Sequence, residues 1–260
     1  MDEIFTRKSG HITTIILNAP ERRNALNYDM WRQFAVVLGK VKSDKTTRVL
    51  IIRGSGDLAF SSGADINEFR KIRANAIQAK KYSIVVEKAI RNLQCFPIPT
   101  ISMIDGDCIG GGCELSLATD IRIASYKSRF GIPAAKLGIA IGYEELKLLV
   151  SLVGIANAKF ILFSGKLFSA EEAYRMGLLT LLEESTKLEQ YTYQLSESVA
   201  KLAPLSHQTH KEMFRLLFSN IEGSVLANKK EFLFSIFDSK DYFRGIEAFK
   251  NKTKPDFIGD

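Results

Sequence analysis

Apolar and polar positions follow two different periods along the first half of the chain. Four short runs of aliphatic and β-branched residues predict buried strands. These runs lie at 12–17, 49–53, 100–104 and 121–124. Between the first two, apolar side chains recur at helical spacing over 30–41 and predict a helix that packs on the sheet. A second helical stripe at 86–93 ends before Pro97 and Pro99, because proline lacks a backbone donor and restricts the preceding residue.

Helical spacing replaces the strand signals from about residue 144 onward. The predicted helical stripes lie at 146–153, 170–176, 188–202, 208–218 and 225–237. Strands and helices that alternate early and give way to helices late indicate an α/β core with a helical layer for capping or oligomerisation. Since no linker or repeat interrupts the chain, we expect one folding unit with an appended helical region.

Composition indicates a soluble globular protein. Of the 260 residues, 46% are hydrophobic and 25% are charged, and this length fits one large domain or two modest ones. The most apolar region, 146–163, is interrupted by Lys147, Asn157 and Lys159, so we expect no membrane insertion. The acidic start of the chain resembles neither a secretory signal nor a transit peptide, which predicts a cytoplasmic protein.

Charge and metal-binding residues narrow the function further. The net charge of +7 favours an anionic ligand such as a phosphorylated small molecule, whereas the dispersed basic residues do not predict nucleic-acid binding. The three cysteines form no CxxC pair and indicate free, buried thiols in a reducing compartment. Only three histidines are present and no carboxylate spacing completes a site with them, so no metal is expected.

Two glycine-centred segments are candidates for chemistry. In the first, 59–66, small residues around Gly63 turn the chain so that backbone N–H groups at a helix start face a ligand. In the second, Gly110, Gly111 and Gly112 connect a strand to a helix. Consecutive glycines carry a cost in conformational entropy, so they indicate either a tight strand-to-helix turn or the close approach of a ligand to main-chain donors.

Together, these segments resemble the paired oxyanion-hole motifs of the enoyl-CoA hydratase/isomerase, or crotonase, family. Residues 18–26 (NAPERRNAL) resemble its NxPxxxNAL motif, 164–178 its later signature and 241–249 its terminal helix. The resemblance implies an α/β fold, a crotonase-like spiral of ββα units. By this resemblance, residues 1–200 form the core with the acyl-CoA site. Residues 201–260 form a helical C-terminal trimerisation region, giving a homotrimer or a hexamer built as a dimer of trimers.

The resemblance also implies an acyl-CoA thioester substrate, with coenzyme A carried by the substrate and no separate cofactor. The N–H groups of Ala64 and Gly111 match the donors that stabilise a thioester enolate, since preorganised donors act most strongly on charge that develops in the transition state. Arg22 and Arg23 match basic residues that meet the phosphates, although a solvated surface role fits each equally well. The implied substrate-binding residues also include Ser62, Gly63, Asp65, Ile66, Asn67 and Gly110.

Glu114 matches the first acid/base glutamate of the hydratases, a role that requires a carboxylate within hydrogen-bonding reach of the reacting atoms. A first-turn partner for the helix dipole is the alternative. The second glutamate is missing, because Ala134 follows Pro133 where the family has Glu. We therefore expect weak hydration, and a rise of about 100-fold on Ala134→Glu.

A changed segment follows this departure. Residues 138–145 read GIAIGYEE where the family has small residues. Either Tyr143, Glu144 or Glu145 supplies a proton relay in place of the missing glutamate, or these are polar residues that open a helix, where acidic side chains are favoured in any case. Both readings remain open from the sequence.

Reversible hydration of a 2-enoyl-CoA is the reaction that the resemblance favours. Family members with altered glutamates carry out isomerisation, decarboxylation or thioester hydrolysis through the same oxyanion hole. A noncatalytic acyl-CoA binding protein is the rival from another functional class. The acyl group and the pathway do not follow from the sequence.

Overall fold

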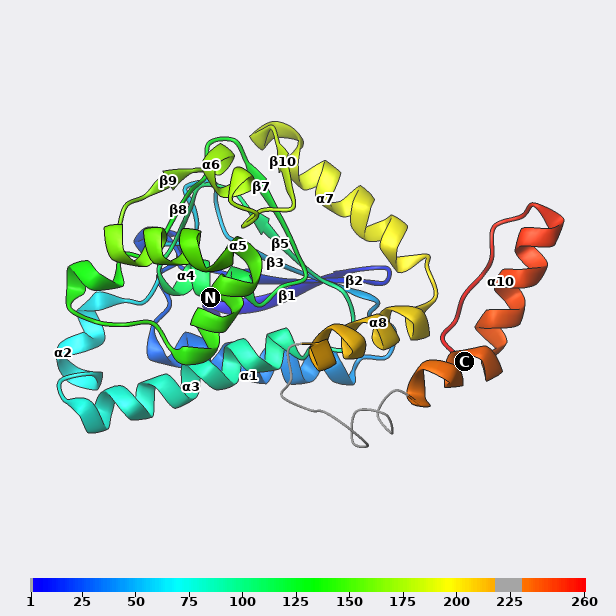
Figure 1. The fold of residues 1–260 in the computed structure, drawn as a ribbon, viewed down its shortest axis with the longest axis horizontal. Helices are drawn as coiled ribbons and strands as arrows, with labels where there is room; N and C mark the ends of the chain where they lie inside the picture. Colours follow the sequence, from blue (N-terminus) through cyan, green and yellow to red (C-terminus); the bar gives the residue numbers. More distant parts are fainter. Residues whose placement is uncertain (1, 218–230) are drawn as a thin grey trace.

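A computed structural model describes residues 2–217 and 231–260, and two β-sheets organise this part of the chain (Figure 1). The larger sheet has six strands, and all neighbours pair in parallel except the first two. In spatial order its strands are β1 (Ile4–Ser9), β2 (Ile12–Leu17), β3 (Val49–Gly54), β5 (Thr100–Ile104), β7 (Ile121–Ser125) and β10 (Leu181–Glu183).

A second sheet of four short strands lies beyond the ends of the first. Its order is β4 (Ala59–Ser61), β6 (Asp107–Ile109), β8 (Arg129–Gly131) and β9 (Phe168–Ser169). Each central strand of the large sheet is followed by one strand of the small sheet, giving the successive pairs β3–β4, β5–β6 and β7–β8. The segments that leave β4, β6 and β8 therefore emerge side by side, and these segments carry the candidate chemistry.

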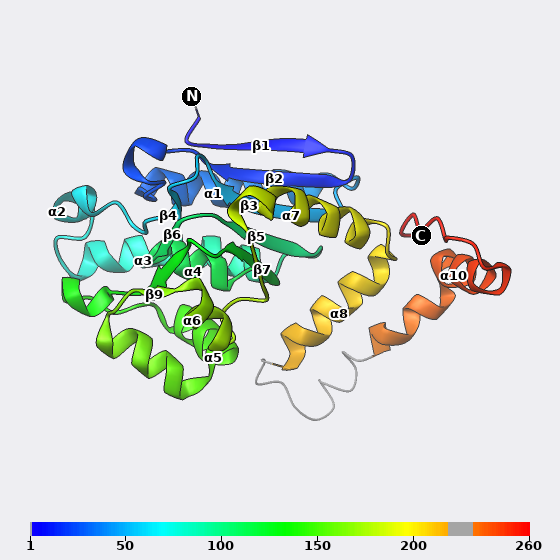
Figure 2. The same ribbon diagram turned by 90° about the horizontal axis from the view of Figure 1, so that it is seen from above.

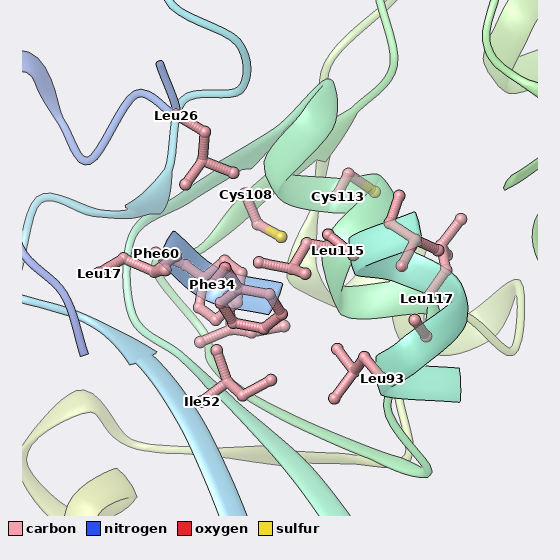
Figure 3. Close-up of a cluster of buried hydrophobic side chains, with 14 of the residues drawn as sticks. Leu17, Leu26, Phe34, Ile52, Phe60, Leu93, Cys108, Cys113, Leu115 and Leu117 are labelled. Atoms are coloured by element: carbon pink, nitrogen blue, oxygen red, sulfur yellow. The ribbon is translucent and has the colours of Figure 1, made fainter. Parts of the chain in front are cut away.

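Helices cover both faces of the large sheet (Figure 2). Strand β3 is buried on both sides: Leu50 and Ile52 face the larger core, whereas Val49 and Ile51 face the smaller one. The larger core contains side chains of α1 (Tyr28–Ser43), α3 (Ala76–Gln94) and α4 (Gly111–Leu117), and the smaller core contains side chains of α7 (Ser185–Ala200). In Figure 3, Phe34, Phe60 and Leu115 meet within the larger core.

The remaining helices extend around this core. They are η1 (Pro20–Arg22), η2 (Ile66–Glu68), α2 (Phe69–Ile72), η3 (Ala134–Leu137), α5 (Tyr143–Ser164), α6 (Ala170–Arg175), α8 (Pro204–Leu217), η4 (Glu231–Asp238) and α10 (Lys240–Asn251). Figures 1 and 2 both show α10 lying apart from the two sheets, beyond α8. The division at residues 200 and 201 stays a prediction.

Helix α5 is long and apolar enough, by length and composition alone, to cross a membrane. Gly154 interrupts it with a non-helical backbone (φ 73°, ψ 162°). Its buried apolar side chains, Leu149, Val153, Ala158 and Ile161, pack into the larger core. Helix α5 is therefore an integral part of the α/β core.

The hydrophobic pattern predicted the central strands and the first two helices correctly. It missed β1 and the whole second sheet, whose strands of two or three residues are too short to show a period. The prediction of a strand-free second half was wrong, because β9 and β10 lie there. Of the predicted helix 225–237, residues 225–230 lie outside the described residues and 231–237 form part of a 3-10 helix; Phe218 also lies outside them.

The cysteines were predicted to be free and buried. All three are free, and Cys108 and Cys113 lie in the larger core, where burial raises the pKa of the Cys108 thiol well above its ordinary range. Cys95 is exposed at the end of α3, which corrects the prediction for that residue.

Candidate active site

A cavity of about 150 Å³ lies where the segments that follow β4, β6 and β8 converge. Its wall combines the loop after β4, helix α3, the start of α4 and the segment that leads into α5. These elements are far apart in the sequence, and the successive strand pairs of the two sheets bring them to one place.

Glycines allow the two loops at the base of this cavity to touch. Gly63 has φ 101°, and a Cβ there would lie 2.8 Å from Ile109 O and 3.2 Å from Gly111 N. Gly110 has φ 52°, in the left-handed region that glycine adopts without steric cost. The glycines are therefore required both by backbone conformation and by close approach of main chain to main chain.

This approach places the amides of Ala64 and Gly111 next to each other. A Cβ on Gly111 would lie 3.4 Å from Ala64 N. The first N–H groups of a helix have no intrahelical acceptor, and Gly111 is the first residue of α4. Over residues 2–217 and 231–260, neither amide donates a hydrogen bond to the protein. Two free donors at one wall of a cavity have the arrangement of an oxyanion hole.

A buried asparagine holds the loop that carries Ala64. Asn24 has φ 54° and donates through Nδ2 to Ala59 O at 2.7 Å and to Ser55 O at 3.0 Å. Its Oδ1 accepts from Ala19 N at 3.0 Å. Leu26 then bridges to the loop, donating to Gly63 O at 2.7 Å. The NAPERRNAL segment (18–26) thus holds in place the loop that carries the Ala64 amide, one of the two donors of the oxyanion hole.

Glu114 projects from the first turn of α4 into the cavity. Burial, and after it the charge of Glu145, raise the pKa of its carboxyl from 4.5 to about 7, although the Arg73 guanidinium opposes both effects. A carboxyl with a pKa near 7 accepts and returns a proton in the neutral range. Helix α4 has only seven residues. The positive potential at this side of the cavity therefore comes from the N–H groups of Ala64 and Gly111 and not from a long helix dipole.

Glu145 enters the same cavity from the start of α5. The residue is 2% exposed, and its Oε2 has no hydrogen-bond partner among the described residues. Burial raises the pKa of this carboxyl, its own backbone N–H lowers it, and the charges of Glu87 and Glu144 raise it again. The structure therefore brings two carboxyls with raised pKa values together with the two free amides.

The other two residues of the GYEE segment lie elsewhere. Tyr143 is 71% exposed, and Glu144 is also exposed, with its Oε2 3.6 Å from the Nζ of Lys147. Neither lines the cavity, whereas Ala134 does. Of the three relay candidates, only Glu145 is brought to the site.

The predicted coenzyme A residues divide into two groups. Ser62, Gly63, Ala64, Ile66, Gly110 and Gly111 line the cavity. Asp65 and Asn67 lie on the adjoining turn, where Asp65 Oδ1 accepts from Asn67. Arg22 forms ion pairs with Glu3 and Glu21, and the exposed Arg23 pairs with Asp107 at 3.2 Å. Both arginines flank the site outside its lining.

The cavity wall also includes side chains that were not predicted from the sequence, among them Trp31, Arg73, Tyr82 and Glu87. The Arg73 guanidinium carbon lies 4.5 Å from the ring centre of Phe69 and 4.7 Å from that of Tyr82. Burial raises the pKa of Tyr82 to about 12. Tyr82 lies one helical turn before Val86 on α3, outside the predicted stripe at 86–93, and Glu87 directly follows Val86. Only the fold shows that this part of α3 lines the same cavity as Glu114.

Metal binding has no support in the described parts of the chain. Residues 2–217 and 231–260 contain no group of three histidine, cysteine or acidic side chains placed to hold an ion. His207 lies on α8, where its Nε2 is 3.3 Å from Val199 O. His207 is partly exposed on this helix.

Comparison with known proteins agrees with this geometry. The sequence model described as enoyl-CoA hydratase/isomerase matches residues 7–260. The short-chain-enoyl-CoA hydratase of Clostridium acetobutylicum is 31% identical over 261 residues, covering 97% of this chain and 99% of that protein. An enoyl-CoA hydratase/carnithine racemase from Magnetospirillum magneticum, 36% identical, matches with a TM-score of 0.96 over 100% of this chain and 97% of its own. An enoyl-CoA hydratase from Bacillus anthracis, 28% identical, matches with a TM-score of 0.93 over 100% of both chains.

These matches confirm the predicted crotonase-like α/β fold. The two solved structures cover the whole chain, α5 included. Sequence and structure therefore agree that the chain belongs to the enoyl-CoA hydratase/isomerase family.

Proposed function

We propose that the protein catalyses the reversible hydration of a 2-enoyl-CoA. One observation carries the proposal: the free amides of Ala64 and Gly111 and the carboxyl of Glu114 face a single cavity. Relatives that are named as enoyl-CoA hydratases support the same class of reaction. The substrate supplies its own coenzyme A, so the reaction requires no separate cofactor.

The two amides bind the thioester oxygen of the substrate. When hydroxide from a water molecule adds to the β carbon, the electrons of the double bond move toward the thioester and form an enolate. The amides stabilise this negative oxygen more than the neutral carbonyl, which lowers the barrier. Glu114, ionised above its pKa of about 7, accepts the proton that the water loses.

The nucleotide end of the substrate lies along the turn that carries the hole. Residues 62–67 and Gly110 form this side of the cavity or adjoin it. Arg22 and Arg23 are the nearby cations for the phosphates, and the net charge of +7 favours an anionic ligand. Binding of phosphates requires these arginines to exchange protein carboxylates for the ligand.

The protein acts in the cytoplasm as a homotrimer or as a hexamer of two trimers. Large apolar side chains on the C-terminal helices are exposed in the single chain, including Phe214, Leu217, Phe243 and Phe249. Exposed apolar area of this kind favours burial against other copies. Sedimentation of the purified protein measures the assembly.

Isomerisation is the second candidate reaction, because Ala134 removes the carboxyl that the family places after Pro133. Moving a proton from one carbon to another requires one well-placed carboxyl, and Glu114 suffices for that. Incubation with crotonyl-CoA and with a 3-enoyl-CoA, followed by mass and chromatographic analysis of products, separates hydration from isomerisation and from binding without turnover.

Removal of one amide tests the hole itself. Gly111→Pro deletes an N–H at the first helical position, where proline fits the backbone, and loss of one such donor costs about 100- to 1,000-fold in kcat. Ala76→Pro is the matched control, because Ala76 is the exposed first residue of α3 outside the cavity. A folded Gly111→Pro protein with the turnover of the control contradicts the proposal.

A further inference from the structure

The start of α5 holds a buried carboxyl that the fold does not use for stability. Glu145 is 2% exposed, yet its Oε2 lacks any hydrogen-bond donor among the described residues. An unsatisfied buried polar atom costs free energy, about 1 to 3 kcal/mol in typical cases. Such a group persists where it has a use that the unliganded fold does not reveal.

The Glu145 carboxyl lines the cavity together with other ionisable side chains. Both Glu145 and Glu114 line the cavity, on α5 and α4, and the charge of Glu145 raises the pKa of the Glu114 carboxyl. Glu87 on α3 adds a third acidic group at the cavity wall, and Arg73 is the cation there. This placement differs from that of Glu144, whose carboxylate lies 3.6 Å from the Lys147 ammonium.

The backbone before α5 leaves space for this carboxyl. A Cβ on Gly142 would lie 2.1 Å from Glu145 Oε2 and 3.0 Å from its Cδ. Gly142 has φ −67° and ψ 159°, a conformation open to any residue. Glycine is therefore needed here for the space that the Glu145 carboxyl occupies and not for backbone freedom.

We infer that Glu145 is the second acid/base residue of the active site and replaces the carboxyl that is missing at Ala134. Glu145 reaches the reacting atoms from α5 instead of from the segment after β8. The inference rests on the proposed hydration and adds to it the group that delivers the proton to the α carbon.

The step balances with the two carboxyls in opposite protonation states. Ionised Glu114 takes a proton from water, and the hydroxide forms a bond to the β carbon of the substrate. The enolate then takes a proton at its α carbon from protonated Glu145, whose O–H bond breaks. The product carries one water, and a proton returns from Glu114 to Glu145 before the next cycle. Mutual repulsion between neighbouring carboxyls favours a pair that holds one proton in all, and this step requires that proton on Glu145.

Matched glutamine variants of neighbouring residues test the assignment. In Glu145→Gln the amide keeps the shape but carries no acidic proton, so kcat with crotonyl-CoA is expected to fall by about 100-fold or more. KM, and the affinity for acetoacetyl-CoA by calorimetry, are expected to change by less than about threefold, because the thioester contacts remain. Glu144→Gln removes an exposed carboxyl one residue away and is expected to retain wild-type kcat.

Glu145→Asp provides the second variant. It keeps an acidic proton on a side chain that is shorter by one methylene, so its kcat is expected to lie between wild type and Glu145→Gln. A purely structural residue would instead show the larger loss with aspartate, because the shorter side chain also leaves a void. Thermal unfolding of each variant identifies any loss that arises from misfolding.

The outcomes separate this inference from the proposed function. A wild-type protein that hydrates no enoyl-CoA overturns both. A wild-type protein that hydrates crotonyl-CoA while Glu145→Gln retains more than about a tenth of its kcat overturns the assignment of Glu145 alone. An aspartate variant that is less active than the glutamine variant also overturns it.

Discussion

The carboxyl of Glu145 occupies the space that a side chain on Gly142 would take, since a Cβ there would lie 2.1 Å from Glu145 Oε2. The two residues open helix α5, one as its N-cap and the other in its first turn. Gly142 and Glu145, three residues apart at the start of α5, thus form one part of the cavity wall.

Gly142→Ala is expected to lower activity without unfolding the protein. The added methyl group displaces the Glu145 carboxyl, while the backbone at φ −67° accepts alanine. We expect kcat for crotonyl-CoA to fall by about tenfold or more. Gly39→Ala is the control, because a Cβ at Gly39 in α1 meets no atom within 4 Å. Equal activity in the two variants would show that the position of the Glu145 carboxyl does not matter.

The pH dependence of hydration reports on Glu114. Its pKa of about 7 means that the ionised, proton-accepting form increases as pH rises, so kcat/KM is expected to rise through about pH 7. Arg73 lowers this pKa, and Arg73→Met is expected to move the rising limb to higher pH. Arg70→Met, at an exposed position on α2 outside the cavity, is the control. A limb that stays in place in Arg73→Met would exclude this electrostatic link.

Stability is expected to respond to Glu114 in the opposite direction from activity. The carboxyl has a higher pKa in the folded protein, about 7, than its ordinary value of 4.5. The folded state therefore loses stability as pH rises from about 4.5 to above 7, by up to about 3 kcal/mol for this group.

Glu114→Gln removes that loss. The unfolding free energy of Glu114→Gln minus that of wild type is therefore expected to be larger at alkaline pH than at acidic pH. The variant is expected to be nearly inactive. Denaturant unfolding at both ends of this range measures the difference. A constant difference between the two proteins would show that Glu114 has an ordinary pKa in the folded state.

Much of the fold could be predicted from hydrophobic period alone. The runs that became β2, β3, β5 and β7 are long enough to show it, and α1 and α3 carry clear apolar stripes. The second sheet could not be predicted in this way. Its strands have two or three residues, and their pairing depends on contacts between segments far apart in the chain, such as Cys108 with Phe130.

The active site, like the fold, was predictable from the sequence only in part. The resemblance of the two glycine motifs to those of the family predicted the paired amides of Ala64 and Gly111, and the structure shows that Gly63 and Gly111 allow the close backbone approach between them. The choice among Tyr143, Glu144 and Glu145 required three dimensions. Consecutive residues of a helix point in different directions, and only the packing of α5 against α4 determines which one faces Glu114.

Asn24 links the first motif to the hole, and its loss is expected to affect both stability and activity. Asn24→Ala removes two donated bonds and two accepted bonds inside the protein and places alanine at φ 54°. Unpaired buried groups cost about 1 to 3 kcal/mol each, so unfolding should shift by at least that amount. Asn18→Ala, at a partly exposed position in the same motif, is the control. Equal unfolding free energies would contradict the scaffold role of Asn24.

Ala134→Glu is the variant in which the assignment of Glu145 changes the expected result. With Glu114 as the only carboxyl, a glutamate at position 134 should raise hydration. The cavity wall already holds the carboxyls of Glu145 and Glu87, however, and a further carboxyl would add a like charge within about 150 Å³ of space. We therefore expect Ala134→Glu to hydrate crotonyl-CoA no faster than wild type.

The same change is expected to help once Glu145 has been neutralised. In the double variant Ala134→Glu/Glu145→Gln, a carboxyl again accompanies Glu114, now from η3, and kcat should rise by about tenfold or more over Glu145→Gln. The two substitutions are then strongly non-additive, as expected for groups that perform one task within one cavity. If Ala134→Glu raised activity equally in both backgrounds, the two positions would act independently, and Glu145 would not be the replacement for the missing glutamate.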